Sequence, residues 1–311
     1  MWPDSAGYLA DKIAVMRRLA LAFGLAVLVA ALPAAQQPFR SSVDLVPVFA
    51  TVLEKGGGYR SGLTKEDFTV LDNGKPQTIT SFSAEVQAVS VSLILDTSGS
   101  MVEAERRVLR AAGIFLDELR EDDRAMVGTL WFQGPPFTSD KKRLRDSLNM
   151  LPRDGSSPIY AALNRALTSL DKEPNRRVIV IYTDGKNNAF IGRQLYSQRG
   201  VVPADPAQLE ENLRARVERD GVMIYALGFE GVSLTRSMKN IATHSGGRAA
   251  ELRRDDDLAE ALAAVVDELH HQYLLGFTPA TFDGQIHKLE VRVKPKGLTV
   301  RARESYVAKG G

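Results

Sequence analysis

The sequence predicts an α/β fold: a doubly wound, mostly parallel, Rossmann-like sheet in the centre of the chain, with a small all-β domain formed by the N- and C-terminal flanks. Three observations lead to this prediction. Between about residues 88 and 271, short apolar segments alternate with segments of helical periodicity, which is the order of an α/β domain. Some segments, such as Val178-Ile179-Val180-Ile181, are apolar at every position, which is typical of parallel strands covered by helices on both faces. On either side, runs of alternating polarity are broken by turn residues, as in antiparallel sheets.

The elements of the central region follow one another in a regular order. The first strand ends in the polar loop Asp96-Thr97-Ser98-Gly99-Ser100 and is followed by a helix, so it opens an α/β unit. The alternation then continues over roughly 180 residues, a length that is sufficient for one hydrophobic core. Strands are predicted at residues 91–95, 125–132, 177–183, 222–229 and 249–252, and helices at residues 102–119, 141–150, 158–170, 206–220, 234–244 and 257–271.

The flanks have the texture of β-strands. Asp72-Asn73-Gly74 supplies residues that tolerate positive φ in a tight hairpin, and Pro295-Lys296-Gly297 predicts a second hairpin turn between the last two strands. Each flank is about 40 residues long, too short to bury a stable core alone, so we expect the two to pair as one sandwich; alternatively, each packs separately on the central region. Strands are predicted at residues 43–49, 68–71, 77–82, 273–277, 287–294 and 298–305.

Residues 16–35 have the pattern of an export signal. Met16-Arg17-Arg18 is the basic start, residues 19–32 are the apolar run, and Pro33-Ala34-Ala35 offers small residues for cleavage. The apolar run is shorter than the roughly 20 residues that cross a bilayer as a helix, so a membrane is contacted only through this segment, if it is not cleaved. We therefore expect an exported protein that is periplasmic, bound in the cell envelope or secreted.

These patterns divide the chain into five regions. Residues 1–15 fit no part of a signal, and we interpret them as an upstream extension, with translation starting at Met16. The other predicted regions are the signal peptide at 16–35, the N-terminal β segment at 40–86, the central domain at 88–271 and, pairing with 40–86, the C-terminal β segment at 272–311.

Composition excludes several classes of function. The chain of 311 residues has 40 Lys plus Arg and 38 Asp plus Glu, a net charge of +2, and this balance gives no indication of nucleic-acid binding. Cysteine is absent, which excludes disulfides, thiolate metal sites, thiol nucleophiles and lipid attachment to an N-terminal cysteine. The histidines have no metalloprotease spacing, and we interpret them as structural or solvated.

Three polar loops are predicted to meet at one edge of the central sheet, because the carboxyl ends of parallel strands lie together. The first presents Asp96, Ser98 and Ser100; the second is Asp154-Gly155-Ser156-Ser157-Pro158; the third is Thr183-Asp184-Gly185. Their side chains offer only oxygen, which suits a hard cation such as Mg²⁺ rather than Zn²⁺ or Cu²⁺. Each loop also has a simpler interpretation, since Ser100 and Ser157 could cap the helices that follow and Asp184-Gly185 could be an ordinary turn.

The pattern Asp96-x-Ser98-x-Ser100 after an apolar strand, with a hydroxyl before a later helix and Asp184-Gly after another strand, resembles the metal-ion-dependent adhesion site of von Willebrand factor A domains. The resemblance covers about residues 89–271. The flanks, at residues 62–68 and 298–303, resemble those of a bacterial exported subgroup of that family.

The resemblance implies a ligand set and a partner. Ser98 and Ser100 would bind the ion directly, Asp96 and Asp184 directly or through water, and the second loop would add a hydroxyl. Mg²⁺ is the expected ion, with Mn²⁺ or Ca²⁺ as alternatives. The open position on the ion would accept an acidic side chain of a protein partner. The family usually has Thr in the second loop, where this sequence has Ser157, with Ser156 as the alternative ligand.

We therefore expect an exported, cation-dependent protein-binding module for adhesion or scaffolding, and not an enzyme. One alternative is a structural module whose metal site is vestigial. A Mg²⁺-dependent, phosphatase-like hydrolase is less well supported, because such enzymes need a second acid two residues after the first aspartate, and here that residue is Ser98. No serine-hydrolase elbow is present in the sequence.

Overall fold

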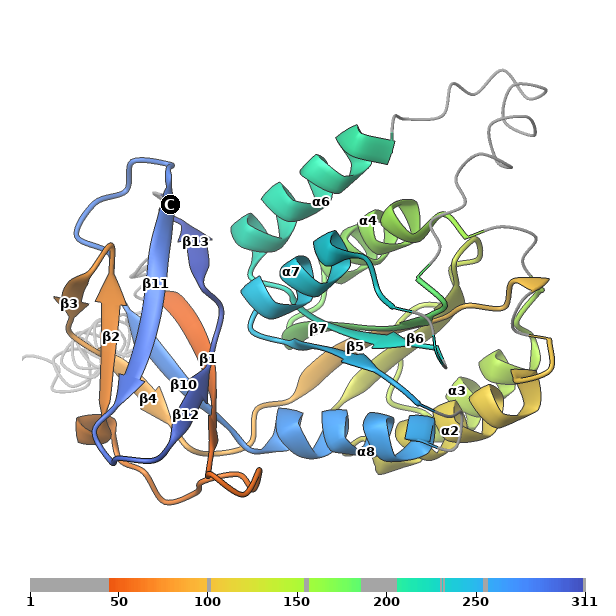
Figure 1. Ribbon diagram of the computed structural model, residues 1–311, viewed down its shortest axis with the longest axis horizontal. Helices are drawn as coiled ribbons and strands as arrows, with labels where there is room; N and C mark the ends of the chain where they lie inside the picture. The colour runs from red at the N-terminus through yellow and green to blue at the C-terminus, as the bar shows by residue number, and fades with distance from the viewer. Residues whose placement is uncertain are drawn as a thin grey trace, which may run out of the picture. The chain divides into compact units, whose positions relative to one another are not determined.

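The computed structural model describes residues 45–99, 102–153, 157–185, 206–229, 231, 233–253 and 257–309. They form one five-stranded sheet with helices on both faces and two four-stranded sheets (Figure 1). This confirms the predicted fold class. The described residues belong to one compact unit.

The central sheet has the order β6-β5-β7-β8-β9, and all neighbouring strands are parallel. Every residue of β5 is buried, because helices cover both faces of the sheet. The strands are β5 (Val89–Leu95), β6 (Arg124–Thr129), β7 (Arg176–Thr183), β8 (Met223–Gly228) and β9 (Arg248–Glu251).

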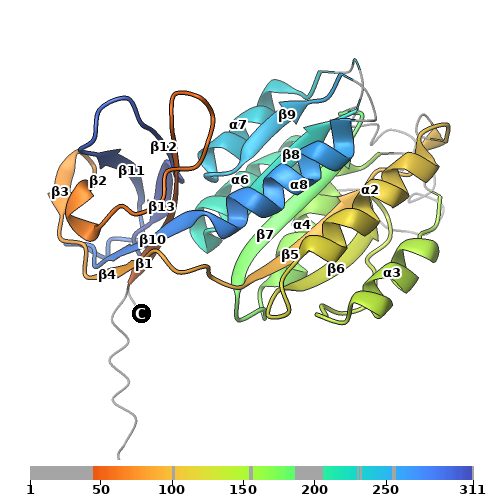
Figure 2. The same ribbon diagram turned by 90° about the horizontal axis from the view of Figure 1, so that it is seen from below.

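The helices cover the two faces of this sheet in groups of three (Figure 2). Alternate residues of β5 serve the two cores: Leu93 and Leu95 pack with one group of helices, and Ile94 packs with the other. The first group is α2 (Glu105–Glu118), α3 (Lys141–Asn149) and α8 (Asp257–His270); the second is α4 (Ile159–Leu170), α6 (Pro206–Asp220) and α7 (Arg236–His244).

The strand predicted at residues 125–132 ends earlier, at Thr129. The Thr129 hydroxyl accepts hydrogen bonds from the backbone N–H groups of Trp131 (3.3 Å) and Phe132 (3.0 Å), and this closes a turn. Short polar side chains often compete in this way with the hydrogen bonds of a strand.

The flanks form two antiparallel sheets, and each sheet contains strands from both ends of the described chain. This confirms the predicted all-β domain; the residue boundaries given above for the five regions stay predictions. Val48, Val70, Leu275 and Leu289, from strands of both sheets, share one buried core. The sheets are β12-β1-β10-β4 and β13-β11-β2-β3, with β1 (Val46–Leu53), β2 (Phe68–Asp72), β3 (Lys75–Gln77), β4 (Ser81–Ser83), β10 (Gln272–Phe277), β11 (Ile286–Val293), β12 (Thr299–Arg301) and β13 (Ser305–Val307).

The two predicted hairpins have different outcomes. The first is confirmed: Asp72 pairs with Lys75, and Asn73 and Gly74 have φ values of 47° and 78°. The second prediction was wrong. The chain does turn near Gly297, where φ is 81°, but β12 then pairs with β1, while β11 pairs with β13. The chain thus crosses from one sheet to the other. The strand with which β12 pairs is determined by distant parts of the chain and not by the turn residues.

A buried carboxylate near the end of α8 connects the central domain to the β-sandwich. Glu268 is 1% exposed and accepts hydrogen bonds from the hydroxyls of Thr51 on β1 (3.1 Å) and Tyr225 on β8 (2.9 Å). It is also ion-paired with Arg301 on β12. Strands of the central sheet and of the sandwich therefore both contact the Glu268 carboxylate. Leaving this charge unpaired in a low-dielectric interior would be costly.

No helix within the described ranges has both the length and the hydropathy needed to cross a membrane. The predicted export signal at residues 16–35 and the extension at residues 1–15 lie outside the described residues.

Candidate functional site

The strand order places a topological switch point between β5 and β7. The chain leaves β5 toward β6 on one side and leaves β7 toward β8 on the other, so the connections diverge at the carboxyl ends of these two strands. Ligand sites of doubly wound sheets lie at such points. Asp96 directly follows β5 and Asp184 directly follows β7, so two of the predicted ligands stand at this position.

Asp96 is held in place from three sides. Its side chain is buried, with the residue 1% exposed, and its Oδ1 accepts a hydrogen bond from the Ser98 backbone N–H (3.0 Å). Its Oδ2 accepts from the Thr183 hydroxyl (2.8 Å), and its own N–H donates to the Tyr182 carbonyl (2.9 Å). Each carboxylate oxygen keeps a further lone pair, because an ionised carboxylate offers about four acceptor positions.

The third loop leaves β7 in a tight turn. The Gly185 N–H donates to the Thr183 hydroxyl (3.1 Å), and Gly185 has a φ of 73°. A Cβ at this position would lie 3.3 Å from the Ser233 carbonyl oxygen, so both the conformation and the space favour glycine. This turn holds Asp184, which is 3% exposed, next to the residue that binds Asp96.

The first loop contacts the segment that directly precedes the second loop. The Thr97 hydroxyl donates to the Pro152 carbonyl (2.9 Å), and Arg153 Nη2 lies 2.6 Å from Glu105 Oε2 at the start of α2. Beyond these contacts the second loop continues to Ser157, which is 2% exposed.

The predicted helix-capping role of Ser157 can be compared with the structure. Pro158 is the N-cap of α4, so Ser157 lies one residue before the cap and Pro158 is not the first helical residue. The Ser157 carbonyl accepts from the Ile159 N–H (3.0 Å). Capping of α4 by an N-cap serine is therefore not its role here.

Ser98 is 6% exposed. Together with Asp96, Ser157 and Asp184, it makes up the predicted ligands that lie within the described residues. Ser100, and in the second loop Asp154, Gly155 and Ser156, lie outside the described residues. Within the described part of the chain, no group of three or more His, Cys, Asp or Glu side chains could hold a metal ion. An ion at this edge of the sheet would therefore depend on hydroxyl ligands besides its two carboxylates, a donor set suited to a hard cation.

Two features of this edge were missed in the sequence. Thr183 was placed in the third loop but was not identified as a partner of Asp96, because that contact depends on the register in which Leu95 lies opposite Tyr182. The Arg153–Glu105 ion pair joins residues 48 positions apart, and no local pattern signals it.

Residues 91–186, which contain this edge of the sheet, match the family model of the von Willebrand factor type A domain. The chain contains a von Willebrand factor type A domain. All five predicted ligand positions fall within the matched residues. No curated protein matches the chain.

The chain is also similar to several solved structures. An aerotolerance-related membrane protein from Bacteroides fragilis is 18% identical, with 58% of this chain and 100% of that chain covered and a TM-score of 0.42. BatB from Bacteroides thetaiotaomicron is 22% identical, covering 58% and 97%, with a TM-score of 0.41. A von Willebrand factor type A protein from Catenulispora acidiphila is 13% identical, covering 86% and 75%, with a TM-score of 0.48. At these values none of the three assigns a function to this chain.

Proposed function

We propose that the von Willebrand factor A domain of this chain is a protein-binding module that depends on a divalent cation, Mg²⁺, held by Asp96, Ser98, Ser100, Ser157 and Asp184. The partner would present an acidic side chain to the ion. The proposal further includes export, through the signal pattern at residues 16–35.

The environment of Asp96 carries this proposal. Asp96 is 1% exposed, and within the described residues no Lys, Arg or His forms an ion pair with it. A buried carboxylate is costly unless a cation or hydrogen bonds compensate for the lost water. Two hydrogen bonds compensate in part, and a bound cation would supply the remaining stabilisation.

The residues present fit a magnesium ion. Asp96 and Asp184 would supply the negative charge, and the serine hydroxyls would supply neutral ligands, as a hard cation accepts. Such a set leaves positive charge on the ion, which would attract an external carboxylate. The hydrogen bonds from Ser98 N–H and the Thr183 hydroxyl orient the Asp96 carboxylate before the ion arrives.

The proposal is tested by thermal unfolding of the protein with Mg²⁺ and with chelator. A ligand that binds only the folded state raises its stability by mass action, so we expect a higher Tm with Mg²⁺. The increase should disappear in Asp96→Ala. Asp122→Ala, which removes a carboxylate that is 54% exposed, is the matched control and should keep the full increase.

Two results would contradict the proposal. An equal Tm with and without Mg²⁺ in the unmodified protein would favour a structural module with a vestigial site. Hydrolysis of phosphate esters that is lost in Asp96→Ala would favour an enzyme. Binding to a partner is tested in parallel by pull-down from the native cell envelope, where retention that depends on both Mg²⁺ and Asp96 is expected.

A further inference from the structure

A cavity with a charged lining lies at the opposite edge of the central sheet. It has a volume of about 520 Å³ and lies between the amino ends of β7 and β8 and strands β1 and β13 of the sandwich. Arg176, at its wall, begins β7, whereas Thr183 ends that strand, so roughly 23 Å separates the cavity from the Asp96 edge. We call it the basic pocket, defined by its charged lining residues Arg176, Arg177, Arg219, Arg303, Lys309, Glu173 and Asp220.

The two carboxylates of the basic pocket do not balance its five cations. Glu173 is engaged through one oxygen, because its Oε2 accepts hydrogen bonds from Arg124 Nε (2.8 Å) and from the Ser90 hydroxyl (2.8 Å). Arg124 does not line the pocket. Among the described lining residues, Asp220 is the carboxylate that ion-pairs with cations of the pocket itself, Arg219 and Lys309.

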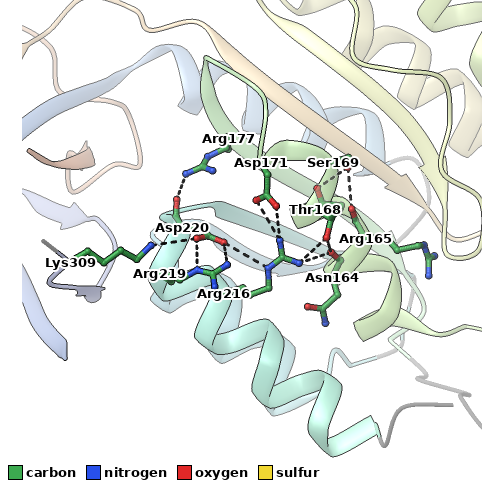
Figure 3. A network of polar contacts seen from close by, with 11 residues as sticks. Asn164, Arg165, Thr168, Ser169, Asp171, Arg177, Arg216, Arg219, Asp220 and Lys309 are labelled. Atoms are coloured by element: carbon green, nitrogen blue, oxygen red, sulfur yellow. Dashed lines mark hydrogen bonds and ion pairs between the residues drawn. The ribbon is translucent and has the colours of Figure 1, made fainter. Parts of the chain in front are cut away.

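Asp220 is shared among several cations (Figure 3). Its carboxylate accepts from Arg219 Nε (2.7 Å) and Nη2 (2.9 Å), and it lies 3.8 Å from Arg216 Nε and 3.9 Å from Lys309 Nζ. Arg177 donates to the backbone carbonyl of the same residue. Burial raises the pKa of Asp220, but Arg219, Lys309 and Arg177 lower it by more, so the carboxyl stays ionised and still leaves positive charge around it.

Arg303 is a buried cation with no acidic partner in the described part of the chain. Its Nε is buried without a hydrogen bond, and its guanidinium carbon lies 5.6 Å from the centre of the Tyr306 ring. Burial lowers the pKa of the Arg303 guanidinium from 12.5 to about 10, which keeps it charged at neutral pH. A cation–π contact offsets only part of the cost of burying such a charge.

The guanidinium of Arg303 occupies space that a glycine leaves free. Gly221, which also lines the basic pocket, has a φ of 63°, and a Cβ there would lie 2.6 Å from Arg303 Nη1. The turn between α6 and β8 thus admits the arginine from the sandwich, although it gives that arginine no negative charge.

We propose that the basic pocket binds a small oxyanion ligand, one that carries phosphate or carboxylate groups and contacts Arg303 and Lys309 of the sandwich together with Arg177 and Arg219 of the central domain. The volume lies in the range of small-ligand pockets, and guanidinium groups match the geometry of both kinds of oxyanion. Because the cations come from both parts, the ligand would hold the sandwich against the central domain. This goes beyond the proposed cation site.

The proposal is tested by titrating the protein with pyrophosphate and, separately, with citrate in a calorimeter, at constant ionic strength. We expect saturable binding of at least one of them, with one site per chain. Saturation by pyrophosphate alone assigns phosphate chemistry, by citrate alone carboxylate chemistry, and by both a pocket that accepts either. Absence of saturable binding of both probes overturns the proposal.

Substitutions test whether the anions bind in the basic pocket. Arg303→Gln should weaken anion binding at least tenfold. The double variant Arg219→Gln with Lys309→Gln should have the same effect. The side chains of Arg219 and Lys309 are 47% and 49% exposed, so we expect this double variant to fold. Arg292→Gln removes an arginine that is 63% exposed on β11 and should bind as the unmodified protein does. Unchanged binding in the folded double variant, or equal weakening by Arg292→Gln, would overturn the proposal. Asp96→Ala should leave anion binding unchanged, which separates this site from the cation site.

Discussion

The Thr183 hydroxyl donates a hydrogen bond of 2.8 Å to Asp96 Oδ2, and this contact joins the carboxyl ends of β7 and β5. Both residues are almost completely buried. The bond sets the direction of the Asp96 carboxylate and also holds the strand end from which Asp184 follows. Thr183 is therefore expected to support the candidate site without itself being one of the proposed ligands.

Replacement of Thr183 by Val keeps the shape of the side chain and removes the donor. Because a buried Asp96 oxygen then lacks its partner, we expect the free energy of unfolding to fall by about 1–3 kcal/mol. Urea unfolding measures this change. Thr69→Val, on the partly exposed face of β2, is the control and should change the free energy by much less. Equal values for the two variants would contradict the role given to Thr183.

Glu268→Gln is expected to be strongly destabilising. It removes the charge that pairs with Arg301 and weakens a group that also accepts from Thr51 and Tyr225. Breaking a buried pair by changing one partner costs about 3–5 kcal/mol; the Arg301 side chain is 21% exposed, so we expect a cost toward the lower end of this range. Urea unfolding of Glu268→Gln, Arg301→Gln and the double variant would show strong non-additivity, because both single changes break the same interaction. Additive effects would mean that the two residues do not stabilise each other.

His287 makes the stability of the sandwich depend on pH. Burial lowers the pKa of His287, but hydrogen bonds to Asp283 and Asp72 and the charges of these carboxylates raise it by more, so it lies above 6.5. Its Nδ1 lies 2.8 Å from Asp72 Oδ1. Below pH 6.5, His287 is protonated in both the folded and the unfolded state, and its stabilisation of the fold is fully present. This stabilisation is lost as the pH rises through the pKa of His287 in the folded state.

The stability difference between the unmodified protein and His287→Gln should therefore be largest near pH 6 and should shrink at about pH 8 and above. Urea unfolding over this range measures it. A difference that stays constant with pH would show that the charge of His287 does not stabilise the fold.

A comparison of Gly246 with Gly57 distinguishes the cost of backbone strain from the cost of a steric clash. Both have left-handed backbones, with φ of 86° and 90°. A Cβ on Gly246 would lie 2.7 Å from the Arg303 backbone nitrogen, whereas nothing lies within 4 Å of a Cβ on Gly57. Gly57→Ala should cost about 1 kcal/mol through φ alone, and Gly246→Ala about 1–3 kcal/mol more through the clash. Similar Tm values for the two variants would contradict the close packing of β12–β13 against the α7–β9 turn.

The sequence was sufficient for features that depend on local pattern. The β5 and β7 strands were predictable because they are rich in apolar and β-branched residues, and Asp96 and Asp184 because polar loops follow those strands. The bond between Thr183 and Asp96 was not predictable, since it joins residues 87 positions apart and requires the register of β5 and β7. The pairing of β12 with β1 was missed for the same reason: a turn signal says where the chain reverses, but not which sheet the next strand joins. Glu268 lies in an ordinary helical pattern, and only its distant partners reveal its role.

The measurement that tests the account most directly is calorimetric titration of the protein with Mg²⁺, compared with Asp96→Ala and Asp184→Ala. We expect one ion per chain in the unmodified protein, and loss of this binding in both variants while Asp122→Ala retains it. Absence of Mg²⁺ binding by the unmodified protein, or equal binding by Asp96→Ala, would contradict the claim that the loops after β5 and β7 hold a cation.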